Sequence, residues 1–397
     1  MQKSECNGCP LASKAVYGYG NERAPVMLIG EAPGERESEL GMPFVGKAGK
    51  ELDGLLERAG LKRESIYITN VVKCRPPGNR KPKKEEILRC MPFLKEEIER
   101  VRPRLIALLG STAVETFLGK LSVEQYHGTF VGRFFISYHP SMAFYGKREV
   151  MAKDFEKLSM AEKALRSEKR LVLLDYDGTL VPITSNPKDA VLSDEGKKIL
   201  KALAERDHVV IVTGRSLRSI RSVFDLDMPI VANHGFEYYK VKEPEGFGRF
   251  ERYRETAKRL YEYFKDMKTK GALVEDKTFG IALHYRNADE NEFFEEFRRM
   301  IDGLDLDNMH IEYGKKVVEL RPNEEWNKGQ VVRYLTGLYE GLPIYIGDDN
   351  SDELAFEAIG EKGITIAVGK RETKARYMFR DEREVLSFLS ILSEEEK

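Results

Sequence analysis

Short apolar runs alternate with amphipathic stretches along the whole chain. In the first half, these runs predict strands at residues 26–30, 65–72, 105–110 and 133–139. Strands that alternate with helical patterns are typical of an α/β fold with a mostly parallel sheet. Ligands of such sheets bind beyond the carboxyl ends of the strands, so we expect functional side chains in the loops that follow these runs.

The second half repeats this alternation but is interrupted by a segment of different character. Its predicted core strands lie at residues 171–175, 209–213, 229–232, 343–347 and 363–368. The interruption has helical patterns at 251–268 and 291–301 and strand-like runs at 278–285 and 309–313. This change of pattern predicts an α+β cap inserted into a second α/β core.

A chain of 397 residues is longer than one compact core usually needs, so two domains are expected. A helical pattern over about residues 148–167 leads directly into the strand at 171, which places the boundary near residue 165. The expected domains are 1–165 and 166–397, the second with its core at 168–236 and 317–397 and its cap at about 237–316. The stretch that begins at Met160 resembles the start of an independent protein. The sequence is therefore compatible with either a natural or an engineered fusion of two genes.

The composition is that of a globular protein. Hydrophobic residues make up 41% of the chain and charged residues 33%, which excludes a disordered tail, a collagen and a coiled-coil rod. No apolar run reaches the roughly 20 residues that cross a bilayer, and the first residues lack the pattern of a signal peptide. We therefore expect a cytoplasmic protein without a membrane partner, and no pattern indicates its oligomeric state.

The net charge of −1 conceals two halves of opposite sign. Residues 1–167 carry 28 Lys and Arg against 21 Asp and Glu, whereas residues 168–397 carry 37 against 45. An excess of positive charge is weak evidence for a nucleic-acid partner of the first half. The most basic stretch, residues 75–84, either grips DNA phosphates or is a solvated proline-rich loop.

All the cysteines lie in the first quarter of the chain, at Cys6, Cys9, Cys74 and Cys90. Thiols stay reduced in a cytosolic protein, so a C-x-x-C pair with two later cysteines indicates a metal or cluster site before it indicates disulfides. Four thiolates suit either zinc or a [4Fe–4S] cluster, and the spacing leaves both open.

Several motifs of the first half appear in a fixed order along the chain. They are Gly30-Glu-Ala-Pro-Gly-Glu, Gly41-Met-Pro-Phe-Val-Gly-Lys-Ala-Gly49, Thr69-Asn-Val-Val-Lys-Cys-Arg-Pro-Pro-Gly-Asn79 and His139-Pro-Ser141. Together with the cysteines, they resemble the family-4 uracil-DNA glycosylases, the iron–sulfur type. The resemblance implies a three-layer α/β/α domain with a four-stranded parallel sheet, uracil-containing DNA as the partner, and a structural [4Fe–4S] cluster on the four cysteines.

The same resemblance implies roles for single residues. Phe44 would stack on the flipped uracil, Asn70 would pair with its donor–acceptor edge, and His139 would donate to the oxygen that gains negative charge. Gly30 and Glu31 would also lie at the substrate. Glycosylases with a Gly-Gln-Asp-Pro motif carry Asp where this chain has Ala32, so Glu31 or electrostatics alone must carry the catalytic step. A cluster-containing DNA-binding module without catalysis is the alternative.

Four motifs of the second half each follow or begin a predicted element. They are Asp175-Tyr-Asp177-Gly-Thr-Leu, Thr213-Gly-Arg215, Lys328 and Gly347-Asp-Asp-Asn-Ser-Asp-Glu353. In this order they resemble the haloacid dehalogenase-like superfamily, which implies a Rossmann-like core. Asp175 would be the nucleophile that forms an aspartyl phosphate, and Asp177 the general acid and base. Mg²⁺ would be held by Asp175, Asp177 and Asp348, with support from Asp349 and Asp352.

Further motifs in this half include Val-Thr-Gly-Arg-Ser, Ala-Asn-His-Gly and Gly-Lys-Lys-Val-Val-Glu-Leu-Arg-Pro. With the four motifs above, they resemble the trehalose-6-phosphate phosphatases. The expected substrate-binding residues are Thr213, Gly214, Arg215, Asn233, Lys315, Glu319, Arg321 and Lys328. We therefore expect a bifunctional chain that acts on uracil in DNA and on trehalose 6-phosphate, with another sugar phosphate or a nucleotide as the alternative second substrate.

Overall fold

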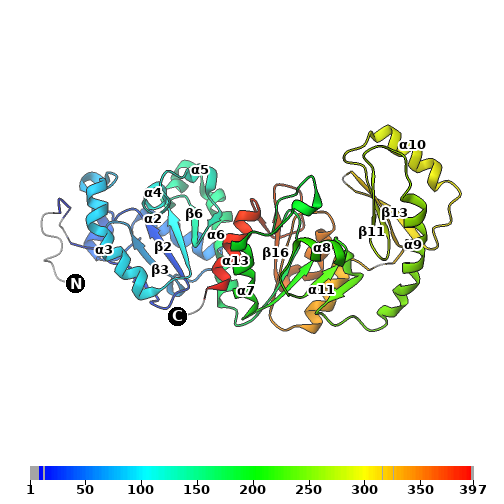
Figure 1. The fold of residues 1–397 in the computed structure, drawn as a ribbon. Coiled ribbons are helices and arrows are strands. Elements are labelled where there is room, and N and C mark those ends of the chain that lie inside the picture. Colours follow the sequence, from blue (N-terminus) through cyan, green and yellow to red (C-terminus); the bar gives the residue numbers. More distant parts are fainter. Residues whose placement is uncertain (1–8, 12–13, 315, 325, 395–397) are drawn as a thin grey trace.

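The structure is a computed structural model that describes residues 9–11, 14–314, 316–324 and 326–394. Within these residues, the chain forms two mostly parallel sheets and one antiparallel sheet, which follow one another along the molecule (Figure 1). No helix in these ranges is long and apolar enough to cross a membrane. The α/β class expected from the sequence is confirmed.

The first sheet has the strand order β1-β3-β2-β4-β6-β5. Its parallel centre is β3 (Tyr67–Asn70), β2 (Val26–Gly30), β4 (Leu105–Leu109) and β6 (Phe134–Ser137). The four-stranded parallel sheet is therefore confirmed. Two antiparallel edge strands, β1 (Tyr19–Gly20) and β5 (Thr129–Val131), extend it and were not predicted.

Helices cover both faces of this sheet. They are α1 (Glu35–Leu40), α2 (Lys47–Arg58), α3 (Lys84–Val101), α4 (Ser111–Leu118), α5 (Val123–Tyr126) and α6 (Arg148–Arg166). Successive side chains of a strand point to opposite faces. Leu28 accordingly packs with side chains of α2 and α6, whereas Met27 and Ile29 pack with side chains of α3 and α4. The result is a three-layer α/β/α unit.

The second sheet has the order β10-β9-β8-β7-β15-β16-β17. Its strands are β10 (Glu237–Tyr239), β9 (Ile230–Ala232), β8 (His208–Val212), β7 (Arg170–Leu174), β15 (Leu342–Gly347), β16 (Ile364–Val368) and β17 (Tyr377–Phe379), all parallel except β10. The helices of this unit are α7 (Asp194–Ala204), α8 (Leu217–Val223), α11 (Lys328–Leu338), α12 (Asp352–Ile359) and α13 (Glu382–Ser393). Strand β7 is central, so the residues after it lie in the middle of the carboxyl edge.

The third sheet forms the cap, in the order β11-β12-β14-β13. Its strands are β11 (Leu273–Asp276), β12 (Ile281–His284), β14 (Val317–Pro322) and β13 (Met309–Gly314), and its helices are α9 (Arg252–Phe264) and α10 (Glu290–Ile301). The structure places both boundaries of the cap later in the chain than the sequence predicted. Strand β10 joins the core sheet, and β14, which the expected limits assigned to the core, pairs with β12 and β13. The sequence pattern of a strand does not state which sheet it joins.

Short 3₁₀ turns complete the described elements. They are η2 (Arg63–Ser65), η3 (Pro77–Asn79), η4 (Pro140–Tyr145), η5 (Pro187–Asp189), η6 (Asn233–Gly235), η7 (Phe247–Glu251) and η8 (Gly360–Lys362). Turn η4 follows His139 directly, and η6 contains the Asn-His-Gly motif.

A buried arginine joins the two parallel-sheet units. The guanidinium of Arg170, at the start of β7, binds both carboxylate oxygens of Asp207 at 3.0 and 2.7 Å. It also donates to the carbonyls of Ala164 in α6 and Leu392 in α13. Helix α13 lies between the two sheets (Figure 1, red). One side chain thus connects the end of the first unit, the first strand of the second and the last helix.

We predict that Asp207→Ala lowers the free energy of unfolding by about 3 kcal/mol, because it leaves the Arg170 cation buried without its anion. Urea denaturation followed by circular dichroism measures the change. Asp225→Ala is the matched control, since the Asp225 carboxylate pairs with Lys197 but is 69% exposed. Equal stability of the two variants would contradict the importance of the buried pair.

Candidate active sites

The loops after β2, β3 and β6 converge on one cleft of the first unit. Glu31, Phe44, Asn70 and His139, all expected from the sequence, line it together. Gly30 permits this convergence: a Cβ atom there would lie 2.4 Å from Cζ of Phe44 and 2.5 Å from Oδ1 of Asn70. A glycine is required because any side chain would separate the ring from the amide.

The Asn70 side chain has a free acceptor at this cleft. The residue is only 2% exposed, and its Oδ1 has no hydrogen-bond partner among the residues that the structure describes. Buried polar atoms are nearly always paired in native proteins. The orphaned oxygen therefore indicates a ligand that brings a hydrogen-bond donor.

A carboxylate that the sequence analysis missed fixes the loop of Phe44. Glu37 is buried and accepts hydrogen bonds from the backbone N–H groups of Gly34, Val45 and Gly46 at 3.1, 3.0 and 2.7 Å. Phe44 itself has a left-handed backbone, with φ of 54°, and its ring centroid lies 5.8 Å from that of His139. The only sequence signal for Glu37 is its position between the two glycine motifs.

His139 is held as a neutral imidazole. Burial lowers its pKa to about 4, although the carboxylate of Glu37 acts in the opposite direction. Nδ1 accepts the backbone N–H of Ser141 at 3.3 Å. Because Nδ1 is the acceptor, the neutral ring carries its hydrogen on Nε2. This nitrogen is available to donate to a ligand.

Glu31 has a partner from another element. The hydroxyl of Thr112, near the start of α4, donates to Oε2 of Glu31. The backbone carbonyl of Glu31 accepts the N–H of Val72 at 3.2 Å. Thr112 is a residue that sequence reasoning missed, and it restricts the orientation of the Glu31 carboxylate.

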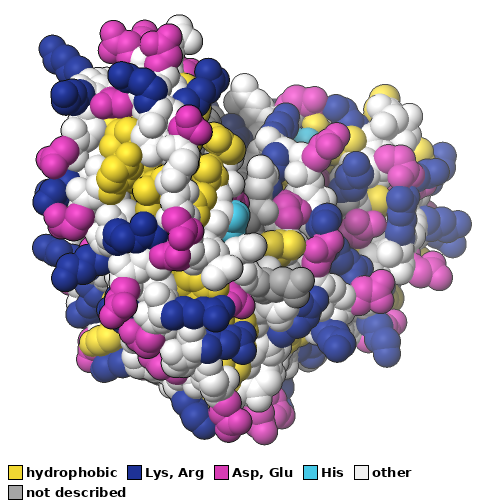
Figure 2. Space-filling view, turned by 90° about the vertical axis from the view of Figure 1, so that its right-hand side faces the viewer, with side chains coloured by type: hydrophobic (Ala, Val, Ile, Leu, Met, Phe, Trp, Pro, Cys, Tyr) yellow, Lys and Arg dark blue, Asp and Glu magenta, His cyan; other side chains and the backbone are white. Residues whose placement is uncertain are grey.

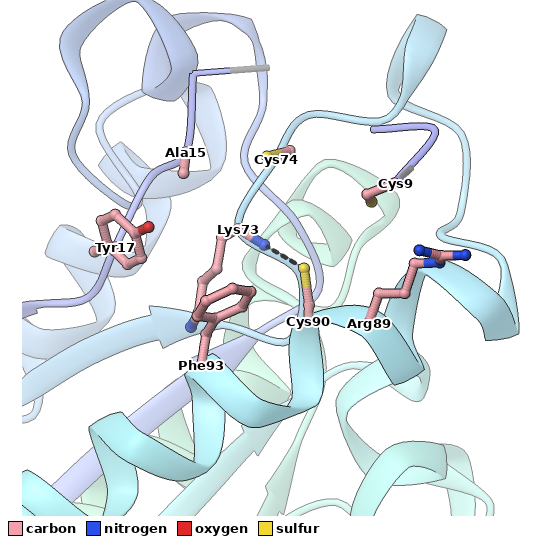
Figure 3. A pocket seen from close by; sticks show the side chains of 8 residues that line it. All are labelled: Cys9, Ala15, Tyr17, Lys73, Cys74, Arg89, Cys90 and Phe93. Carbon is pink, nitrogen blue, oxygen red and sulfur yellow. Dashed lines mark hydrogen bonds between the residues drawn. The ribbon is translucent and has the colours of Figure 1, made fainter. Parts of the chain in front are cut away.

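The described cysteines meet at a second, small cavity of the same unit. Cys9, Cys74 and Cys90 line it (Figure 3), whereas Cys6 lies outside the described residues. Burial raises the pKa of the Cys90 thiol to about 11, so only a bound cation would make it a thiolate at neutral pH. The donor set fits a thiolate-bound metal or cluster.

A buried lysine lies between the cysteine cavity and Asn70. The backbone N–H of Lys73 donates to Sγ of Cys90 at 3.5 Å, as the dashed line in Figure 3 shows. Its ammonium donates to Thr69 Oγ1, to the Asn70 carbonyl and to Glu97, at 2.7, 2.8 and 2.6 Å. Sequence reasoning missed this network, which ties the end of β3 to the helix that carries Cys90.

In the second unit, Asp175, Lys328 and Asp352 form a buried charged cluster at the end of β7. The Lys328 ammonium lies 2.8 Å from Asp175 Oδ1 and 2.7 Å from Asp352 Oδ1. Burial acts to lower the pKa of Lys328, but the two carboxylates outweigh it and raise that pKa well above its usual value. Tyr345, which the sequence analysis did not single out, donates to Asp352 at 2.7 Å.

Three carboxylates could hold a metal ion here. One oxygen from each of Asp175, Asp348 and Asp352 lies within 4.8 Å of the others. Burial, followed by repulsion from Asp352 and Asp349, raises the pKa of Asp348 to about 7. Gly178 makes room for it, since a Cβ there would lie 2.2 Å from Asp348 Oδ2. Hard oxygen ligands in this arrangement fit Mg²⁺.

The other residues expected at this core differ in their burial and in their partners. Thr213 is buried at the end of β8, next to β7. Asp177 is held by a bidentate ion pair with Arg215, at 2.5 Å for both contacts. The guanidinium of Arg215 is therefore engaged by a carboxylate in this structure. Asp349 accepts backbone N–H groups at the start of α12, and its side chain is 53% exposed.

The cap reaches this core through a lysine that the sequence analysis missed. Lys277 donates to the carbonyl of Gly214 at 2.9 Å and pairs with Glu319 at 2.9 Å. Asn233 donates to the Lys277 carbonyl. Arg321 pairs with Glu312. Lys315 lies outside the described residues.

Charges of both signs lie on the surface of the cap end (Figure 2). Figure 2 views this end and shows Lys and Arg side chains mixed with Asp and Glu. A small anion could be bound in this unit by a buried cation such as Lys328, so its binding does not require a basic surface.

Comparison with known proteins matches each unit to a different family. The family model "Uracil DNA glycosylase superfamily" matches residues 17–166, and the model "Trehalose-phosphatase" matches residues 173–383. The chain belongs to both families. Each expected resemblance is thereby confirmed, and the molecule combines a glycosylase domain with a phosphatase domain.

Individual relatives show the same division. A type-4 uracil-DNA glycosylase of Saccharolobus solfataricus is 42% identical over 176 residues, which cover 40% of this chain and 82% of that protein. A probable trehalose-phosphate phosphatase 2 of Oryza sativa subsp. japonica is 32% identical over 263 residues, or 57% of this chain and 68% of that protein. A solved trehalose-6-phosphate phosphatase related protein is 28% identical with a TM-score of 0.49, covering 56% of this chain and 96% of its own.

We predict that Glu37→Gln lowers the rate of uracil excision about tenfold, because the amide nitrogen of Gln would face a backbone N–H and loosen the loop of Phe44. Excision from a uracil-containing oligonucleotide measures this effect. Glu39→Gln, on the same helix but exposed, is the control and should leave the rate unchanged. Identical rates for the two variants would show that Glu37 does not fix the loop.

Proposed function

We propose that the glycosylase domain hydrolyses the N-glycosidic bond of uracil in DNA and that the phosphatase domain removes phosphate from trehalose 6-phosphate, both in the cytoplasm. The proposed boundary near residue 165 falls in the last turn of α6. The orphaned Oδ1 of Asn70 is the observation that carries the first activity. The burial of Lys328 between two carboxylates supports the second.

The Asn70 amide has the correct polarity for uracil. Its Oδ1 would accept the N3–H of the base, and its NH₂ group would donate to O4. Cytosine presents an acceptor and a donor at these positions, so both contacts would reverse. Phe44 supplies the face against which the base stacks.

Bond cleavage needs a donor on the base and a positioned water on the sugar. As the C1′–N1 bond breaks, its electron pair moves into uracil, and Nε2–H of the neutral His139 donates to the O2 atom that gains charge. Water adds to C1′, and Glu31, oriented by Thr112, is placed to position that water. Ala32 offers no carboxylate for this step.

We further propose that Cys6, Cys9, Cys74 and Cys90 hold a [4Fe–4S] cluster. When bound, its irons would supply the positive charge that buried thiolates require and would cross-link the N-terminal segment to the loop after β3. Zinc on the same cysteines is the alternative that the spacing leaves open.

The basic segment 75–84 is proposed as a DNA contact. Arg80 and Asn79 line the same cleft as Asn70, which places the segment beside the base-binding site. Arg80 is partly neutralised by Glu86 at 2.6 Å, whereas Lys83 and Lys84 are exposed. The exposed cations would contact phosphates and make binding sensitive to salt.

In the phosphatase domain, Asp175 is proposed as the nucleophile. Its carboxylate would attack phosphorus while the sugar oxygen leaves and takes a proton from Asp177. Lys328 and Thr213 would hold the phosphoryl oxygens.

Mg²⁺ would neutralise charge on the phosphoryl group. Its proposed ligands are Asp175, Asp348 and the Asp177 carbonyl, with support from Asp349 and Asp352. Arg215 pairs with Asp177 and orients its carboxyl group. After it has given up its proton, Asp177 is the proposed base that activates water in the second step.

Sugar recognition is assigned to the cap. Glu319, Arg321 and Lys277 are charged groups on the cap sheet and its β11–β12 turn, and such groups bind sugar hydroxyls. Asn233 lies where the cap meets the core. Lys315 belongs to the same proposed set. Trehalose 6-phosphate is the proposed substrate because the phosphatase relatives carry that name.

The two activities should be lost separately. His139→Ala should abolish uracil excision and leave phosphatase activity intact, whereas Asp175→Asn should do the reverse, since each removes a group that touches only one substrate. Alkali-labile abasic sites and released phosphate are the readouts. A wild-type chain that produces no abasic sites would refute the glycosylase proposal and leave the DNA-binding alternative.

The cofactor proposal has its own test. Anaerobically purified protein should contain about four iron atoms per chain and absorb visible light, and Cys90→Ser should lose both properties because it removes a ligand. Metal analysis and absorption spectra measure this. If the protein instead contained stoichiometric zinc and no iron, the cluster assignment would be wrong and the cysteines would form a zinc site.

The choice of sugar phosphate is tested with a panel. With Mg²⁺ present, trehalose 6-phosphate should give the highest kcat/KM among sugar phosphates and nucleotides. Glu319→Gln should reduce this preference more than it reduces the rate with a small phosphate ester, because it changes the cap and not the nucleophile. A higher kcat/KM with another phosphate would overturn the substrate.

A further inference from the structure

The outer edge of the glycosylase sheet is covered by the last helix of the chain. Strand β5 is an edge strand, and its outward backbone N–H groups at Phe130 and Gly132 donate to Glu384 Oε1 and Ser387 Oγ, at 3.0 and 3.1 Å. Both acceptors belong to α13. The Phe130 ring also packs against Phe388, with centroids 5.6 Å apart. An open strand edge is a liability that proteins cover, and here α13 covers it.

The carboxylate of Glu384 is buried together with one cation. It is 2% exposed and lies 2.6 Å from the ammonium of Lys157, on α6. Lys157 also donates to the Gly128 carbonyl at 2.7 Å and lies over the ring of Phe379. Among these contacts, each of the two side chains has only the other as a partner of opposite charge. Removing one would therefore leave the other as a buried charge without a counter-ion.

Helix α6 carries this contact to the glycosylase site. Asp154, one turn before Lys157, accepts the hydroxyl of Ser137 at 3.0 Å and binds His127 at 3.0 Å. Ser137 ends β6, two residues before His139. Gly128 must lack a side chain, because a Cβ there would lie 2.5 Å from Asp154 Oδ1. The end of β6 is therefore fixed by α6 on one side.

We propose that Glu384, on the helix that follows the phosphatase core, is a positioning residue of the glycosylase: through Lys157 and Asp154 it fixes the end of β6 and so the place of His139. The inference rests on the proposed glycosylase function. Under this proposal, α13 supports the glycosylase site and is also part of the phosphatase core, because the same helix packs against α7. A change in the second domain should then alter chemistry in the first.

The test uses the full chain with Glu384→Gln, which removes the charge and keeps the shape. Single-turnover excision of uracil from saturating DNA should slow about tenfold, as expected for a displaced catalytic group, while the Kd for DNA and the phosphatase kcat change less than about twofold. Glu382→Gln, on the same helix but less buried, is the control and should match wild type. An unchanged excision rate in Glu384→Gln would overturn the inference.

A double-mutant cycle separates positioning from general destabilisation. If Glu384 acts through Asp154, Asp154→Asn and Glu384→Gln should slow excision less in combination than the product of their separate effects. Fully multiplicative effects would overturn the proposed route. If Glu384→Gln does not fold, Glu384→Asp, which keeps the charge but withdraws the carboxylate from Lys157, carries the same test with a smaller slowing. A wild-type chain without excision would instead refute the proposed function.

Discussion

Much of the architecture depends on four ion pairs that are buried in the part of the chain that the structure describes. They are Lys73 with Glu97, Lys157 with Glu384, Arg170 with Asp207, and Lys328 with Asp175. Breaking a buried pair costs several kcal/mol, so each pair dictates which elements must stay adjacent. The first joins the cysteine cavity to the Asn70 strand, and the second joins the domains. The third holds Arg170, whose guanidinium also donates to the Ala164 carbonyl of α6, and the fourth assembles the phosphatase site.

The two sites use this constraint in opposite ways. In the glycosylase site, the groups proposed to touch the base are uncharged: burial holds His139 neutral, and Asn70 and Phe44 carry no charge, which suits an uncharged base. The phosphatase site concentrates charge, with Lys328 among three carboxylates, which suits a phosphate and a cation. The division agrees with the overall charges of the two halves, positive where DNA is the proposed substrate and negative where a metal is proposed.

Sequence reasoning predicted residues at the carboxyl ends of parallel strands, such as Asn70, the last residue of β3, and Asp175, directly after β7, because each lies in a local motif that the family resemblance identifies. It missed contacts between distant segments. Glu384 and Lys157 lie 227 positions apart, and no local pattern indicates their pairing. Glu37 and Thr112 were missed because an acidic or hydroxyl side chain has many ordinary surface roles. Strand β14 was placed in the wrong sheet because alternation shows a strand but not its partner.

The buried contacts between the domains predict that the two enzymes unfold together as one cooperative body. The most direct test follows uracil excision and trehalose 6-phosphate hydrolysis in the same samples as urea is raised. Because α13 and the Arg170 contacts bind the domains together, both activities should disappear over one common range of urea concentration. Excision that persists at urea concentrations where the phosphatase is already unfolded would contradict it.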